Sequence, residues 1–287
     1  VAGVGSTFLF TLPVKTSGVV HEKSSAGEME LLPITALLVE DSLTNQMVAT
    51  AMLEKVGCQI TIANNGYEAI EQVQKAAFDV VLMDVSMPGM DGLEASRRIR
   101  ALGGHYQTLP ILAMTAHAFA HDREACLEAG MNDYLSKPLQ REQLYAMLKR
   151  WALHKDSVVE NSEEPVLAPV AMVGTTKPIL DETIIQTLIS DTSPDLFKQL
   201  VAIFLQESKA HVDALPELLK QGDIAACAKH AHAVKSTAGA LGAVALQDMC
   251  GQLEVACRES KPNIVALLQA TTNVAEASWQ ALYSRLN

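Results

Sequence analysis

Between residues 36 and 151, five short apolar runs alternate with five helix-like segments, and this order constrains the fold more than any other feature. The runs lie at Ala36–Val39, Gln59–Ile62, Val80–Met83, Ile111–Met114 and Asp133–Leu135. The helix-like segments lie at Thr44–Val56, Tyr67–Ala76, Leu93–Ala101, Asp122–Ala129 and Arg141–Trp151. Strands and helices that alternate in this way predict an α/β fold with a doubly wound, five-stranded parallel sheet and helices on both faces.

After Pro178 the pattern becomes helical, because alanine, leucine and long polar residues dominate and no β-branched alternation remains. We expect helices at Asp181–Ile189, Pro194–Lys220, Asp223–Ala238, Val244–Glu259 and Asn263–Arg285. Asp181 is the expected N-cap of the first of them. Helices joined by short connections predict an all-α, up-and-down bundle.

The composition divides the chain into two domains, as its 287 residues also suggest. We predict domains at 34–152 and 179–287, with linkers at 14–33 and 153–178 that lack periodicity. The flexible stretch Asp156–Pro178 of the second linker, about 23 residues, would span about 26 Å, enough for the two domains to meet within one chain.

Charge, hydropathy and cysteine usage exclude several classes of function. The formal net charge is −11 (22 Lys and Arg against 33 Asp and Glu), and no basic run stands out, so direct nucleic-acid binding is not expected. No apolar stretch reaches the ~20 residues of a membrane span, and no signal peptide opens the sequence. The five cysteines form no CxxC pair, which favours buried, reduced thiols in a cytoplasmic protein.

Chemically active residues stand where the predicted strands end, which is the edge at which a doubly wound sheet binds ligands. Glu40 and Asp41 follow the first run, Asp84 the third and Thr115 the fourth, while Lys137 comes just after the fifth. Two carboxylates ~4 Å apart repel by roughly 4 kcal/mol at an effective dielectric constant near 20. Because one lysine offsets only one of three acids, we expect a hard divalent ion such as Mg2+ in this pocket.

These residues lie in segments that resemble a response-regulator receiver domain, a flavodoxin-like fold, over residues 35–150. The matching segments are LLVEDSLTNQMVA, VVLMDVSMPGMDGLEASRRIR, PILAMTAHAF and GMNDYLSKPL. The resemblance implies that Asp84 is phosphorylated. It also implies that Glu40, Asp41 and Asp84 hold Mg2+ together with the backbone carbonyl of Ser86.

The same resemblance assigns a catalytic lysine and a conformational switch. Lys137 would neutralise a phosphoryl oxygen, and Thr115 would be the switch hydroxyl that bonds another. Tyr134 would be the aromatic side chain that moves when Thr115 turns inward. The alternative for Tyr134 is an ordinary half-buried aromatic residue on a strand.

One histidine of the helical half stands out. In the predicted helix Asp223–Ala238, His232, Lys235 and Gly239 share one face, whereas His230 and His232 diverge, which argues against a metal site made by those two. We expect Lys235 to disfavour a charged imidazole at His232, and small residues around Gly239 to let another protein approach.

The segment AHAVKSTAGALGA resembles the histidine-phosphotransfer (HPt) domain over residues 179–287, and LEVAC agrees with its following helix. The resemblance implies that His232, not His230, is phosphorylated, with Lys235 and Gly239 as helpers. The alternative is a binding or dimerisation module in which the histidine has no chemical role.

Residues 1–13 resemble the last glycine box and closing strand of a histidine-kinase ATP-binding domain, so the whole order resembles the C-terminal part of a tripartite hybrid sensor histidine kinase. This implies a phosphorelay from a kinase histidine to Asp84, then to His232, then to a downstream response regulator. The expected partners are the kinase core of the same parent protein and that regulator's receiver.

We expect no ATP-dependent kinase activity and no membrane contact from this fragment, and a cytoplasmic location with the parent anchored in the inner membrane. The alternative is a Mg2+-dependent phosphatase, although the DxD pair of one such family is absent because Val85 and Ser86 follow Asp84.

Overall fold

The first part of the chain is built on a parallel sheet. The computed structural model describes residues 33–115, 120–153 and 177–286. The strands are β1 (Thr35–Val39), β2 (Gln59–Ala63), β3 (Val80–Asp84), β4 (Ile111–Thr115) and β5 (Asp133–Ser136). All pair in parallel, in the order β2-β1-β3-β4-β5. The predicted doubly wound, five-stranded sheet is confirmed, and every strand ends within one residue of its expected bounds.

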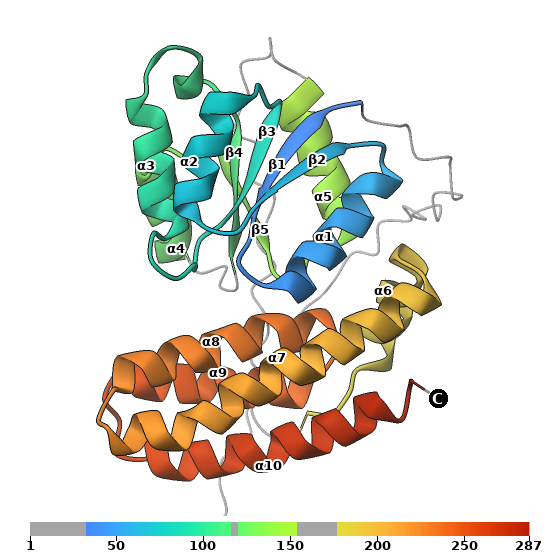
Figure 1. Cartoon of the computed structure of the whole chain (residues 1–287), viewed down its shortest axis with the longest axis vertical. Coiled ribbons are helices and arrows are strands. Elements are labelled where there is room, and N and C mark those ends of the chain that lie inside the picture. Colours follow the sequence, from blue (N-terminus) through green and yellow to red (C-terminus); the bar gives the residue numbers. More distant parts are fainter. Residues whose placement is uncertain (1–32, 116–119, 154–176, 287) are drawn as a thin grey trace, which may run out of the picture. The chain divides into compact units, whose positions relative to one another are not determined.

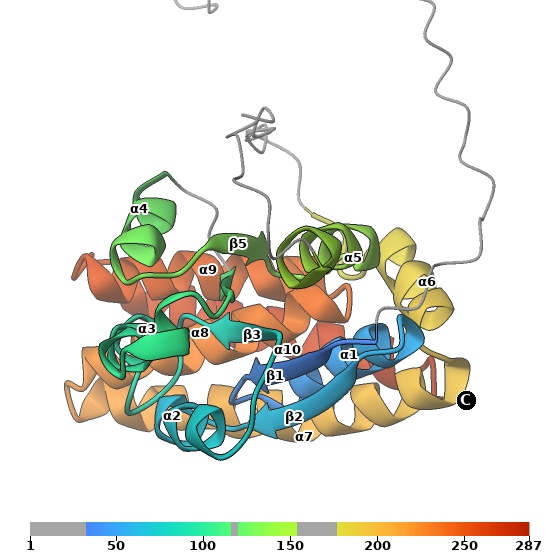
Figure 2. The same cartoon turned by 90° about the horizontal axis from the view of Figure 1, so that it is seen from above.

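Helices cover both faces of this sheet (Figures 1 and 2). They are α1 (Leu43–Lys55), α2 (Gly66–Lys75), α3 (Gly92–Ala101), α4 (Ala120–Glu128) and α5 (Arg141–Leu148). Figure 1 shows α1 and α5 on one face and α2, α3 and α4 on the other. The central strands β3 and β4 are buried along their whole length, which explains why their sequences are continuous apolar runs.

Capping residues fix where these helices begin. The side chains of Ser42, Asn65 and Asp91 each accept a hydrogen bond from a backbone N–H of the first turn of α1, α2 and α3. The last helix differs from its expected range 141–151, because α5 ends at Leu148 and a π-helical turn, Lys149–Leu153, continues it. Trp151 in this turn donates its indole N–H to Asp133 of β5 (3.0 Å), which anchors the turn to the sheet.

The second described part of the chain is helical (Figure 1). Its helices are α6 (Glu182–Asp191), α7 (Pro194–Lys220), α8 (Ile224–Ala240), α9 (Val244–Arg258) and α10 (Ile264–Tyr283). Contacts join α7 to α8, α8 to α9, α9 to α10 and α10 back to α7, while α6 packs on α7. This cyclic order is that of an up-and-down four-helix bundle and confirms the predicted all-α half. Asp181 caps α6 as expected, accepting from the backbone N–H groups of Thr183 and Ile184.

Several sequence predictions concern residues that the structure does not describe. The kinase-like remnant at 1–13, and nearly all of the linkers at 14–33 and 153–178, lie outside the described residues, so the domain boundaries stay predictions. Among the helices that are described, none combines the length and apolar character needed to cross a membrane. All five cysteines are buried free thiols.

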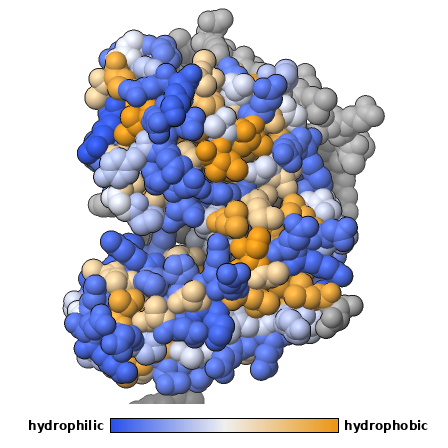
Figure 3. Space-filling model, in the orientation of Figure 1, coloured by the Kyte–Doolittle hydropathy of each residue, from blue (hydrophilic) through white to orange (hydrophobic). Residues whose placement is uncertain are grey.

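The described surface is mainly hydrophilic on the face drawn in Figure 3, where hydrophobic residues gather only in small patches. Large apolar side chains with substantial exposure are Leu43, Ile62, Tyr67, Leu102, Leu127, Ile179, Val255, Val265 and Tyr283. Apolar residues scattered in this way are normal on a folded domain.

Candidate functional site

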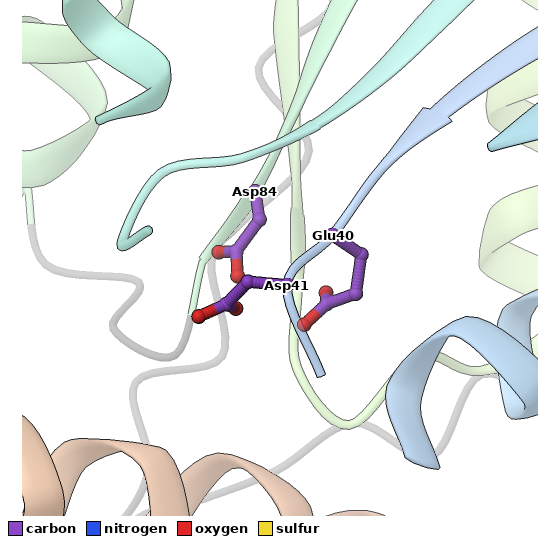
Figure 4. A group of neighbouring side chains, drawn as sticks. All are labelled: Glu40, Asp41 and Asp84. Carbon is purple, nitrogen blue, oxygen red and sulfur yellow. The ribbon is translucent and has the colours of Figure 1, made fainter. Parts of the chain in front are cut away.

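Three carboxylates meet at the carboxyl edge of the sheet (Figure 4). Glu40 and Asp41 follow β1, and Asp84 is the last residue of β3, the neighbouring strand. One oxygen from each of the three lies within 4.8 Å of the others, an arrangement that could hold a metal ion. Glu40 and Asp84 are 2% and 5% exposed, so their charges are held away from water. The structure thus brings together the acids that the sequence placed at strand ends.

Lys137 lies among these acids. Its Nζ is 2.6 Å from Oε2 of Glu40 and 2.8 Å from Oδ2 of Asp84. The ammonium thus bridges two carboxylates, and its single positive charge still offsets only one of the three acids. Loss of water would lower the pKa of Lys137, but the charges of Asp84 and Glu40 outweigh this and raise it. Lys137 therefore stays protonated.

The electrostatics of Glu40 show that the pocket still has an excess of negative charge. Burial raises the pKa of Glu40 to about 7; Lys137 opposes this rise, and the neighbouring charge of Asp84 adds to it. Asn45 of α1 donates from Nδ2 to Oε1 of Glu40 (3.0 Å), so both carboxylate oxygens of Glu40 have donors. A carboxyl group that burial and a second acid push toward the neutral form is well suited to a divalent cation.

The turn after β3 holds Asp84 in place. The backbone N–H of Ser86 donates to Oδ1 of Asp84 (3.2 Å), whereas its expected role as a carbonyl ligand stays a prediction. The N–H of Gly92 donates to the carbonyl of Val85 (3.0 Å) and brings the start of α3 against the end of β3. A Cβ at position 92 would overlap the backbone oxygen of Asp84, so only glycine fits there. Sequence reasoning missed both Gly92 and Asn45.

The two proposed switch residues lie on adjacent strands. Thr115 ends β4 and is buried, and Tyr134 lies on β5, half-buried against the apolar core on the α2–α3 side of the sheet. The guanidinium of Arg123 lies 5.9 Å from the centre of the Tyr134 ring. This position is that of an ordinary half-buried aromatic residue on a strand. It also allows the ring to move when Thr115 does, so the conformational switch stays a prediction.

In the helical part, the surroundings of His232 differ from those expected. Nδ1 of His232, on α8, is 2.9 Å from Oε1 of Glu254, on α9. Nζ of Lys235 is 3.1 Å from Oε2 of the same carboxylate, and Arg258 lies 2.6 Å from Oε1. The charge of Lys235 is thus balanced by Glu254, and the repulsion between Lys235 and the imidazole is not the controlling interaction that the sequence suggested.

Glu254 is a further residue that sequence reasoning missed. It is 1% exposed and lies on the same stripe of α9 as the buried residues Cys250, Leu253 and Cys257. Burial alone would raise the pKa of Glu254. The hydrogen bond and charge of His232, with the charges of Lys235 and Arg258, outweigh burial and lower the pKa to about 2. An ionised carboxylate only accepts hydrogen bonds, so Nδ1 of His232 must hold a proton, and the lone pair of the neutral ring is on Nε2.

Gly239 has a packing role in addition to the expected one. It is buried, and a Cβ at this position would overlap the side-chain amide of Gln247 on α9. The glycine therefore leaves room for that amide, and its expected role in letting another protein approach stays a prediction.

Family models identify both parts of the chain. Residues 36–149 match the response regulator receiver domain, and residues 199–286 match the Hpt domain. The chain therefore contains a response regulator receiver domain followed by an Hpt domain. This confirms both resemblances that the sequence showed.

Its relatives are sensor proteins of the hybrid type. The chain is 30% identical over 231 residues to sensor protein GacS of Pseudomonas syringae pv. syringae. This alignment covers 79% of this chain and 25% of the length of GacS. It is 31% identical over 261 residues to the aerobic respiration control sensor protein ArcB of Escherichia coli K12, and this alignment covers 88% of this chain and 32% of the length of ArcB. It is thus homologous to the C-terminal parts of such kinases and spans a quarter to a third of their length.

Among solved structures, the receiver domain of sensor histidine kinase PA1611 from Pseudomonas aeruginosa PAO1 is 43% identical. The alignment has a TM-score of 0.40 and covers 42% of this chain and 98% of that one. That structure has a magnesium ion coordinated in its active-site cleft.

Proposed function

We propose that this chain passes a phosphoryl group from a donor phosphohistidine to Asp84, from Asp84 to His232, and from His232 to the receiver of a separate response regulator. The observation that supports this most directly is that each half has a matching reactive group. Asp84 lies beside two further acids and Lys137, and His232 has its Nδ1 engaged by Glu254.

In the first step a carboxylate oxygen of Asp84 attacks the phosphorus, a P–O bond forms, the P–N bond of the donor breaks, and the donor imidazole leaves with the electron pair. Such transfers depend on positioning and charge neutralisation rather than on covalent help. The backbone N–H of Ser86 orients Asp84. Lys137 already contacts Asp84 and would neutralise one phosphoryl oxygen, and Thr115 would donate to another.

The acidic residues fit a magnesium ion. Glu40, Asp41 and Asp84 offer three oxygens close together, and Mg2+ prefers carboxylate oxygens while keeping waters that a phosphoryl group can displace. We propose that these three residues hold it, with the carbonyl of Ser86. When bound, the ion supplies positive charge to the phosphoryl oxygens.

In the second step Nε2 of His232 attacks the acyl phosphate. The new P–N bond forms, the P–O bond to Asp84 breaks, and Asp84 leaves as a carboxylate. The proton on Nδ1 stays in place, because Glu254 accepts it in a hydrogen bond. As Nε2 gains its bond the ring becomes more positive, and the buried charge of Glu254 stabilises that ring.

The helical half contributes the histidine but little of the other machinery, so its chemistry depends on a receiver's Asp, Lys and metal. This dependence makes the kinase core and a downstream receiver the natural partners of the chain.

The test is to label the chain with 32P-acetyl phosphate in the presence of Mg2+. Label that alkali removes is expected first, on Asp84, and alkali-stable, acid-labile label is then expected on His232. Asp84→Asn should abolish both, His232→Gln should retain only the alkali-labile label, and EDTA should prevent labelling. The exposed controls Glu71→Gln and His105→Gln should behave as the unmodified chain.

Two results would contradict the proposal. Labelling of His232 in Asp84→Asn would mean that the receiver is not the donor. Steady release of inorganic phosphate without labelled His232 would favour a phosphatase, with the helical half as an interaction module.

A further inference from the structure

A second pair of histidines lies in the helical bundle, away from the Glu254 cluster. His211 on α7 and His230 on α8 face each other across the α7–α8 contact, with their Nδ1 atoms 3.1 Å apart. The ring planes are nearly perpendicular (75°), and the ring centres are 4.9 Å apart. Both side chains are half-buried. In the sequence analysis His230 matters only because it points away from His232. The proposed phosphorelay uses neither His211 nor His230.

The distance fits two ligands of one metal ion. With metal–nitrogen bonds of about 2.0–2.1 Å, two nitrogens 3.1 Å apart subtend about 100° at the ion, between the octahedral and tetrahedral angles. Rings that direct both Nδ1 lone pairs at such an ion would have centres about 4.8 Å apart, whereas a straight N–H···N bond would place them about 5.4 Å apart. In the structure the two Nδ1 atoms share a hydrogen bond, whose proton a metal ion would replace, and the observed centre distance of 4.9 Å is close to that of the convergent arrangement.

Burial favours the uncharged form of an imidazole, which is the form that binds metals. It lowers the pKa of His211, and the neighbouring His230 lowers it further. The residues one turn away on α8, Cys227 and Val234, are buried apolar neighbours that provide no opposing charge. Neutral imidazoles suit borderline transition metals such as zinc and copper, in contrast to the oxygen ligands that attract Mg2+.

We propose that His211 and His230 form a binding site for a divalent transition metal of the zinc class, which bridges α7 and α8 through both Nδ1 atoms. Among the described residues, no third His, Cys, Asp or Glu gathers with them, so water completes the coordination and the site binds more weakly than a closed four-ligand site. The metal ties α7 to the helix that carries His232 and raises the melting temperature of the bundle.

The test is Zn2+ binding to the full chain by competition with a chromogenic chelator, in excess Mg2+ to occupy the carboxylate pocket. His211→Asn and His230→Asn should each weaken one Zn2+ site at least tenfold. His105→Gln and His232→Gln should leave that site unchanged. Circular dichroism and melting in EDTA show whether each variant is folded.

A second readout does not depend on the variants. The 15N resonances of Nδ1 in both His211 and His230 should shift together on Zn2+ addition, while Mg2+ leaves them unchanged. The proposal is overturned if the two resonances do not respond to Zn2+, or if Zn2+ affinity persists in folded His211→Asn and falls only in His232→Gln.

Discussion

At the scale of single residues, the reactive groups of both halves are defined by buried charges that neutralise one another. Lys137 joins Glu40 and Asp84 in the receiver pocket, and Glu254 joins His232 and Lys235 in the bundle. Lys137 contacts two carboxylates, and both carboxylate oxygens of Glu254 are contacted by charged or polar side chains. These contacts offset the free-energy cost of removing each charged group from water. The same contacts orient the atom that is to react.

Glu254→Gln tests this orientation at His232. The amide oxygen can still accept from Nδ1, but the negative charge that stabilises the phosphorylated ring is lost. We expect the transfer from Asp84 to His232 to slow about tenfold, which corresponds to about 1.4 kcal/mol. The rate is measured by quench-flow as alkali-stable label, with the exposed acid Glu259→Gln as the matched control. An unchanged rate in folded Glu254→Gln would show that the contact is only structural.

Acid should weaken the bundle through the same residue. The pKa of Glu254 is about 2 in the fold, below its ordinary value of 4.5, so its stabilisation is complete above pH 4.5 and is lost as the pH falls toward 2. Because its side chain is 1% exposed, the loss is about 2–3 kcal/mol. Urea unfolding is followed by the fluorescence of Trp279 in a Trp151→Phe background. The stability difference from Glu254→Gln should shrink between pH 5 and pH 2.5, and a constant difference would refute the shifted pKa.

At the scale of helices, Gly239 of α8 leaves room for the side-chain amide of Gln247 on α9. Alanine in a helix is normally favoured over glycine by about 0.5–1 kcal/mol. At position 239 the added methyl group would displace the flexible amide of Gln247, so we expect Gly239→Ala to lose this gain and to leave the stability of the bundle nearly unchanged. Combining it with Gln247→Ala should restore the gain.

Gly251→Ala is the matched control, because this glycine also lies inside a helix and a Cβ there would make only ordinary contacts, the nearest at 3.7 Å with Lys235. We expect it to stabilise the bundle by about 0.5–1 kcal/mol. If both glycine substitutions changed the urea midpoint equally, the close contact with Gln247 would not be what requires glycine.

Regular elements were predictable from sequence because their signals are local. The apolar runs of β3 and β4 and the cap at Asp181 depend on residues within one element. The acids were also predictable, because parallel strands end at one edge. The role of Glu254 was not predictable, because its partner His232 is 22 residues away on another helix. An acid within the apolar stripe of α9 indicates that the side chain is buried, but it does not identify the residue that it contacts. His211 and His230 likewise meet only across a helix contact.

At the scale of the whole molecule, one chain contains both Asp84, the proposed phosphoryl acceptor, and His232, the histidine proposed to take the group onward. If the segment between the two domains is a flexible tether, as its composition predicts, the effective concentration of one site at the other is about millimolar. Transfer from Asp84 to His232 should then be first-order, with a rate constant that does not change when the protein is diluted.

A mixture of Asp84→Asn and His232→Gln chains separates the two routes. Each variant lacks one site, so alkali-stable label on the Asp84→Asn chain can only come from another molecule, and its rate should fall in proportion to concentration. At micromolar protein the unmixed chain should therefore transfer about a thousandfold faster than the mixture, following the ratio of millimolar to micromolar concentrations. The two rates are compared by quench-flow over a tenfold dilution. Equal rates in both samples would mean that the helical half receives its phosphoryl group from a separate molecule and that the tether gives no advantage.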